Sequence, residues 1–200
     1  MVFADCWFLN VMHKLKIKIL GLLVIKSLAF SSIAQEVYAE KLPENPKVAY
    51  GKADFKSSNN KLTINQNTNK LITNWSSFNI AKGYDVEFKQ PSAQSTALNR
   101  VQSNDPTYIT GSLKANGNII LINPSGVLFQ NGSKVDVGSI IATTLNLKDG
   151  DFIKDKFIFE REGVAGIVDN MGEISAFEGG VVALIAPQVK NQGKIETKNG

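Results

Sequence analysis

The chain has 200 residues, of which 43% are hydrophobic and 20% are charged, and its formal net charge is +4. This composition supplies a sizeable core for one domain and argues against disorder. Four of the 22 bases and one of the 18 acids precede Gln35, so the rest of the chain has 18 bases and 17 acids. It therefore lacks the cationic surface of a nucleic-acid-binding protein.

Residues 1–34 have the layout of a secretory signal peptide. A basic stretch from Met12 is followed by an apolar run over Ile19–Phe30 and then by small residues. The run contains Lys26 and is shorter than the ~20 residues of a membrane span, so a cleaved signal is favoured over a membrane anchor. Cleavage is expected after Ala34.

The cleavage position and the start of translation each have an alternative. Ala39 is a weaker candidate for the cleavage position. Residues 1–11 lack the basic character of a signal start, so we hypothesise that translation begins at Met12.

The only cysteine and the only histidine, Cys6 and His13, both lie before the expected cleavage site. The mature chain would have no disulfide, no Ser-His-Asp or Cys-His nucleophile system, and no imidazole or thiolate ligand for zinc or copper. We therefore predict no catalytic residues, no metal site and no cofactor, with only carboxylate or calcium chemistry left open.

Five acidic residues are the candidates for that chemistry: Asp149, Asp151, Asp155, Glu160 and Glu162. The aspartates lie around a glycine between apolar stretches and lack the ligand spacing of an EF-hand loop. We interpret them as solvated charges that decorate a turn.

The next part of the chain predicts an irregular segment and then strands. Gln35–Lys56 contains two prolines and little periodicity, whereas alternating apolar residues from Leu62 to Phe88 are typical of half-buried strands. The polar stretch that follows is predicted to hold a short helix over Ser95–Arg100 or to cross as a loop. The less repetitive region Gln35–Phe78 is a candidate cap.

From Gly111 onward the composition changes, and 13 of the 16 glycines lie there. Asn-Gly pairs normally indicate antiparallel hairpins. However, the sequence repeats at an offset of 21 residues, which places Val168 over Val189 and Ile174 over Ile195. A repeat of this length is typical of one turn of a β-solenoid, in which each strand pairs in parallel with the same strand one turn away.

Two apolar runs, Ile119–Ile122 and Val181–Ala186, exceed what one inward face needs. Strands covered on both faces have this composition. Something outside the coil is therefore expected to cover them, and the candidates are the segment near Phe157 and the strand Tyr84–Phe88.

Three features occur one after another along the chain: the string "TGSLKANGNIILINPSGVLFQNGSKVDVGSIIATTLNL", then an F-x4-F segment, and then the N-x-G-x-I repeats. This order resembles the N-terminal secretion domain of two-partner-secretion exoproteins, the haemagglutination activity domain of the filamentous haemagglutinin type. The likeness covers Val48 to Gly200. It implies a right-handed parallel β-helix with an N-terminal cap and small extra-helical β elements.

The resemblance also implies a partner and candidate recognition residues. The family's Asn-Pro-Asn-Gly motif corresponds to Asn123, Pro124, Ser125 and Gly126, which either contact the partner or form a structural turn. The family's second motif, Asn-Pro-Asn-Leu, is absent. In its place stands Ala97–Val101, as in the adhesin-like subgroup.

Within that segment, Asn99 and Arg100 either belong to the recognition surface or make internal bonds, with Arg100 an equal candidate for a structural ion pair. The implied partner is a dedicated outer-membrane β-barrel transporter, which recognises the domain through periplasmic POTRA modules.

The leading hypothesis is a non-enzymatic secretion and folding-nucleation module over residues 35–200 of an adhesin, haemagglutinin, haemolysin or contact-dependent toxin. It would be exported through the periplasm to the cell surface or extracellular space without stable membrane insertion, and its C-terminal end is expected to be incomplete. One alternative is a freestanding surface adhesin that binds host glycan or protein. A less favoured alternative is a polysaccharide-active β-helix enzyme.

Overall fold

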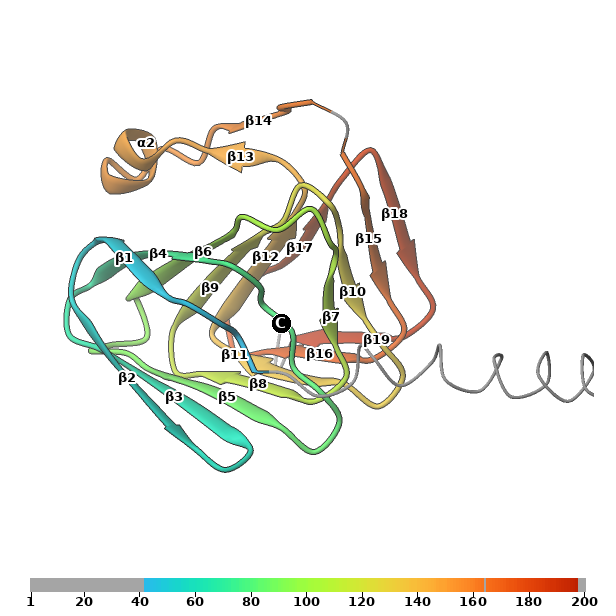
Figure 1. Ribbon diagram of the computed structural model, residues 1–200. Coiled ribbons are helices and arrows are strands. Elements are labelled where there is room, and N and C mark those ends of the chain that lie inside the picture. The colour runs from blue at the N-terminus through green and yellow to red at the C-terminus, as the bar shows by residue number, and fades with distance from the viewer. Residues whose placement is uncertain (1–41, 164, 198–200) are drawn as a thin grey trace, which may run out of the picture. The chain divides into compact units, whose positions relative to one another are not determined.

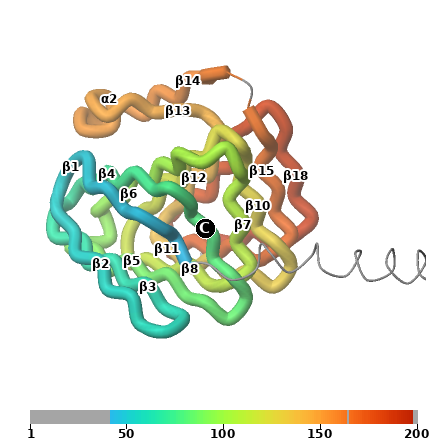
Figure 2. The backbone as a smooth tube through the Cα atoms, viewed as in Figure 1, coloured from blue at the N-terminus to red at the C-terminus, as the bar shows by residue number. Residues whose placement is uncertain are grey.

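The computed structural model describes residues 42–163 and 165–197, which form a coil of three sheets (Figure 1). Its path goes from the seven-stranded sheet to the six-stranded sheet, then to the four-stranded sheet, and back (Figure 2). Apart from the antiparallel edge strands β1 and β2, strands in these sheets pair in parallel. The fold is thus the expected parallel β-helix. The predicted signal peptide and its cleavage sites lie outside the described residues.

The seven-stranded sheet contains β2 (Ala53–Ser58), β3 (Lys61–Gln66), β5 (Asp85–Lys89), β8 (Ser112–Ala115), β11 (Lys134–Val137), β16 (Glu173–Ala176) and β19 (Lys194–Thr197). The six-stranded sheet contains β1 (Lys47–Tyr50), β4 (Lys70–Trp75), β6 (Thr96–Val101), β9 (Asn118–Ile122), β12 (Ser139–Thr143) and β17 (Val182–Ile185). The four-stranded sheet contains β7 (Thr107–Ile109), β10 (Val127–Phe129), β15 (Ile167–Asn170) and β18 (Gln188–Asn191).

The register of the last two turns confirms the 21-residue repeat. Val168 pairs with Val189, and Ile174 pairs with Ile195. At the corner that follows β15, the buried Asn170 accepts a hydrogen bond from the Gly172 amide and donates one to Asn191 in the next turn. The repeated Asn therefore both closes a corner and links two turns.

The interior of the coil is a stack of apolar side chains from all three sheets. Leu121, Phe129 and Val135 are each at most 2% exposed and belong to one cluster. Complete burial of such side chains contributes roughly 1.5–3 kcal/mol each. Because every turn adds the same kind of contact, the interior needs no disulfide.

The N-terminal end has a cap, and that cap is smaller than predicted. β1 and β2 pair antiparallel with β4 and β3, and Phe55 of β2 packs edge-to-face on Trp75 at 5.6 Å. However, β3 and β4 pair in parallel with β5 and β6 and so form the first turn of the coil. Their alternating apolar residues fill the interior like those of later turns.

The expectation of an irregular segment over Gln35–Lys56 was wrong, because β1 lies within it and β2 begins in it. Other local predictions were wrong as well. Ser95–Arg100 is neither helix nor loop, because Thr96–Val101 forms β6 with Ala97, Asn99 and Val101 buried. The polar residues at three of its six positions hid the strand period. Likewise, the strand β5 does not cover the coil from outside, since Val86 and Phe88 belong to its interior.

The outside cover is an insertion, residues 146–163, between β12 and β15. It contains β13 (Asn146–Leu147), helix α2 (Asp149–Ile153) and β14 (Phe159–Glu160), which pairs antiparallel with β13. Leu147 and Phe152 are fully buried against the outward residues of the six-stranded sheet, Ile72, Leu98, Ile120 and Ile122.

The prediction of a two-sided strand is thus confirmed for Ile119–Ile122 and wrong for Val181–Ala186. The residues of β17 are only half-buried, and Val181 beside it is 58% exposed. β17 is the last described strand of its sheet, so none of the described turns lies beyond its inward residues Val182 and Leu184.

Candidate partner-recognition site

The Asn-Pro-Ser-Gly motif forms the corner between β9 and β10. Asn123 follows β9, and its side-chain oxygen accepts a hydrogen bond from the Ser125 amide at 2.9 Å. The Gly126 amide donates to the Asn123 carbonyl at 3.0 Å, and Gly126 has a φ of 127°, which favours glycine. Both bonds close a tight turn.

The side chain of Asn123 also ties this corner to the preceding turn of the coil. Its amide group donates to the Asp105 carbonyl and to the Thr107 hydroxyl, both at 3.0 Å. Asn123 is fully buried, whereas Pro124 and Ser125 are half-buried. The functional group of Asn123 is therefore completely engaged inside the protein.

Ser125, which stands where the family motif has a second Asn, makes one side-chain bond. Its hydroxyl donates to the Ser103 carbonyl at 3.3 Å. On the other side of the corner, the Gly166 amide donates to the Pro124 carbonyl at 2.7 Å. A Cβ at Gly166 would overlap the Ser125 carbonyl. Sequence analysis missed Gly166, because its close approach to Ser125 depends on a contact 41 positions away.

Asn99 lies inside the coil, where it is fully buried. Its side-chain oxygen accepts a hydrogen bond from the indole N–H of Trp75 at 3.0 Å, and its amide donates to the Ala97 carbonyl at 3.3 Å. Trp75 in turn packs edge-to-face on Phe78 at 5.3 Å. Asn99 thus satisfies a buried indole at the first turns of the coil.

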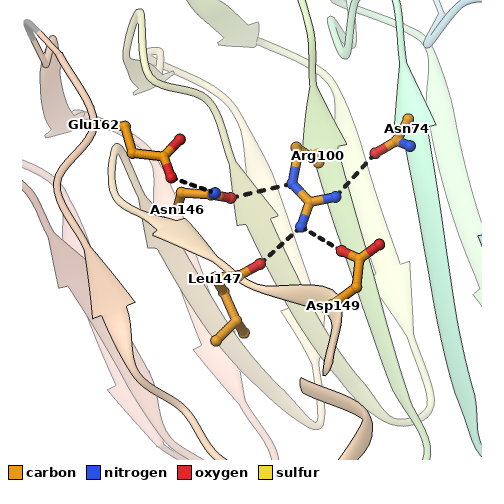
Figure 3. A network of polar contacts seen from close by, with 6 residues as sticks. All are labelled: Asn74, Arg100, Asn146, Leu147, Asp149 and Glu162. Atoms are coloured by element: carbon orange, nitrogen blue, oxygen red, sulfur yellow. Dashed lines mark hydrogen bonds and ion pairs between the residues drawn. The ribbon is translucent and has the colours of Figure 1, made fainter. Parts of the chain in front are cut away.

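Arg100 points the other way, out of the six-stranded sheet, and holds the insertion (Figure 3). One guanidinium nitrogen donates to the Leu147 carbonyl at 2.7 Å and to Asp149 at 2.8 Å. The others donate to Asn74 at 3.1 Å and to Asn146 at 3.3 Å. The Arg100 side chain is 19% exposed. A planar guanidinium suits such divergent contacts better than an ammonium group.

A second cation, Lys70 of β4, makes the same connection and was missed by sequence analysis. Its ammonium group donates to the carbonyls of Phe152 and Ile153 at 3.2 and 2.7 Å and pairs with Asp155 at 2.7 Å. These carbonyls belong to the C-terminal end of α2, where positive charge is favourable. Nothing local in the sequence connects Lys70 with residues 82 or more positions away.

Two of the five acidic candidates, Asp149 and Asp155, take part in this attachment, and Glu160 and Glu162 make contacts within the insertion. Asp149 and Asp151 lie in α2, and Asp149 and Asp155 pair with the two cations of the coil. Glu160 pairs with Lys148 at 2.6 Å and raises the pKa of that lysine. Glu162 accepts a hydrogen bond from Asn146 at 3.1 Å.

The described residues contain no group of three or more His, Cys, Asp or Glu side chains placed to hold a metal ion. Among the same residues, no helix has the length and apolar character to cross a membrane.

Comparisons with known proteins give one consistent family. The profile of the "TPS secretion domain" family matches residues 38–200. A heme/hemopexin-binding protein of Haemophilus influenzae strain Rd is 34% identical over an alignment of 192 residues, which covers 92% of this chain and 21% of that protein. A second heme/hemopexin-binding protein of Haemophilus influenzae is 31% identical over 134 residues, or 66% of this chain and 14% of that protein.

The fold has a solved counterpart. The crystal structure of the HMW1 secretion domain from Haemophilus influenzae matches with a TM-score of 0.75 and 30% sequence identity, over 78% of this chain and 42% of that one. The chain thus spans about a fifth or less of the curated relatives and under half of the solved domain.

Proposed function

Because the chain belongs to the family of TPS secretion domains, the secretion modules of two-partner-secretion exoproteins, we propose that POTRA modules of a cognate outer-membrane transporter recognise it in the periplasm. The transporter then carries the exoprotein to the cell surface or the extracellular space. The family match over residues 38–200 is the observation that supports this proposal.

The motif residues have structural roles in this proposal. Asn123 is fully buried and fixes a corner, and Arg100 attaches the insertion. Recognition therefore acts through neighbouring exposed surface, with Pro124 and Ser125 as the half-buried part of the motif that remains within reach.

The decisive experiment is secretion in cells that express the chain with or without the transporter encoded nearest its gene. The chain is expected outside the cell only with that transporter, and purified protein is expected to bind the purified POTRA modules. Release without the transporter, or no binding by folded protein, would contradict the proposal. A glycan-binding screen would then test the freestanding adhesin.

The proposed role in folding is supported by the edges of the coil. β17, β18 and β19 are the last described strands of their sheets, so a following segment could pair with them as each turn pairs with the next. In a longer chain, Phe129→Ala is expected to reduce protease resistance downstream as well as within the domain. Unchanged downstream resistance would contradict a template role.

A further inference from the structure

Exposed apolar side chains occur at two kinds of place. Among residues 42–163 and 165–197, the exposed large hydrophobic side chains are Val48, Tyr50, Phe157, Ile158, Val181, Val189 and Ile195. All except Phe157 and Ile158 lie in, or directly beside, the first or last described strand of a sheet, where the stack simply ends. Phe157 and Ile158 are 48% and 52% exposed in the middle of the chain. The end of the stack does not explain their exposure.

Around this pair, most acidic side chains of the insertion have partners, whereas two lysines have none among the described residues. Of the five carboxylates in the insertion, four are already engaged, by Arg100, Lys70, Lys148 and Asn146. By contrast, Lys154 and Lys156 are exposed and form no ion pair within the described residues. The Phe157 segment, defined as Lys154 to Phe159, therefore presents two apolar side chains next to two free cations.

The backbone beside this pair offers a free strand edge. β14 begins at Phe159 and pairs only with β13 in a two-stranded sheet of the described chain, so its other edge has no strand partner. Such an edge is a template for another strand. A partner strand that extends the β14 pairing back over Phe157 and Ile158 would place these two side chains on opposite sides, where one flat surface cannot bury both. A strand edge flanked by pockets can.

The insertion is also held in one place. An isolated two-stranded ribbon is marginal by itself. Here Arg100 and Lys70 attach both β13 and α2 to the coil, and Phe152 is buried beneath them. A segment held in its binding geometry loses less entropy when it binds.

We propose that the Phe157 segment is the docking segment for the transporter's periplasmic modules. The partner would add a strand along β14, enclose Phe157 and Ile158 in apolar pockets, and place acidic side chains opposite Lys154 and Lys156. The proposal rests on the proposed function, because it names the surface by which the POTRA modules hold this domain.

The test compares the binding of purified variants to the purified POTRA modules. Phe157→Ser with Ile158→Ser is expected to weaken binding about tenfold or more, since buried anchors dominate such interfaces. The matched control is Val181→Ser with Val189→Ser, which removes two apolar side chains of similar exposure at the end of the coil. Urea unfolding should show that both double variants keep the stability of the wild type.

The charge component has its own test. Lys154→Glu with Lys156→Glu is expected to weaken binding and to reduce its salt dependence, while the exposed pair Lys82→Glu with Lys89→Glu serves as control. Loss in the control pairs equal to that in the test pairs would overturn the proposal. So would binding to anionic lipid vesicles that needs Phe157 and Ile158.

The binding data distinguish failure of the docking segment from failure of the proposed function. If wild type binds the POTRA modules and the Phe157/Ile158 variant binds equally well, the docking segment is wrong and the proposed function stands. If folded wild type fails to bind, the proposed function is wrong, and this inference falls with it.

Discussion

The two faces of the six-stranded sheet are both buried, but by different means. The inner face packs in the coil, where apolar side chains from three sheets repeat turn after turn. The outer face is covered by a single insertion that Arg100 and Lys70 hold through polar contacts. The inner packing is cooperative and inseparable from the fold, whereas the outer cover is one local unit. The insertion should therefore detach before the coil unfolds.

Two fully buried phenylalanines give the strongest test of this difference. Phe129→Ala, in β10, should lower the free energy of unfolding by about 3–5 kcal/mol, because it leaves a cavity inside the coil. Phe152→Ala, in α2, should lower it less and should instead increase hydrogen exchange over 146–163. Urea unfolding and exchange mass spectrometry measure both. Equal global losses would mean that cover and coil unfold together.

The next largest loss of unfolding free energy is expected at a polar corner of the coil. Asn123→Ala removes two donated hydrogen bonds and one accepted bond, leaving the Ser125 amide without its partner. We expect a loss of about 2–3 kcal/mol in unfolding free energy. The matched variant Ser125→Ala removes one long bond and should lose about 1 kcal/mol or less. Similar unfolding midpoints for the two variants would contradict a structural corner.

A smaller global effect is expected at the attachment of the insertion. Arg100→Met should make residues 146–163 susceptible to protease while lowering the unfolding free energy by about 1 kcal/mol, because Asp149 can turn to solvent. The control is Lys89→Met, at an exposed lysine of the seven-stranded sheet. Wild-type protease resistance in Arg100→Met would show that burial of Phe152 holds the insertion without the cation.

The smallest effect is expected on the seven-stranded sheet, where Lys61 and Glu87 pair at 2.7 Å. The hydrogen bond from Lys61 lowers the pKa of Glu87 below its ordinary value of 4.5. This stabilisation is present above the unfolded pKa and is lost as pH falls through the lowered value in the folded protein. Because solvent screens this exposed pair, its contribution to stability should be small.

Unfolding midpoints at neutral pH and at about pH 3 measure this contribution. Glu87→Gln should show a smaller acid-induced loss of stability than the wild type. An equal loss in both proteins would assign the acid sensitivity to other carboxylates.

At the candidate site, the sequence predicted local features of the backbone but not the side-chain contacts between distant segments. The motif predicted either a turn or a partner contact at Asn123, and the turn follows from the local backbone preferences of Asn, Pro and Gly. It did not show that the side chain bonds to Asp105 and Thr107 in the preceding turn. The choice between internal bonds and surface for Arg100 depended on the insertion, whose contacts lie 46 to 49 positions away.

The sequence by itself determined the coil, since a 21-residue repeat of apolar, Asn and Gly positions carries strand period, corner spacing and register together. The tertiary structure alone decided which strands form the first turn, which face of the six-stranded sheet is covered, and what Lys70 and Arg100 bind. Because successive turns repeat, the pairing of their strands can be predicted from the sequence. Attachment of a single insertion has no period, and its contacts exist only once the chain has folded.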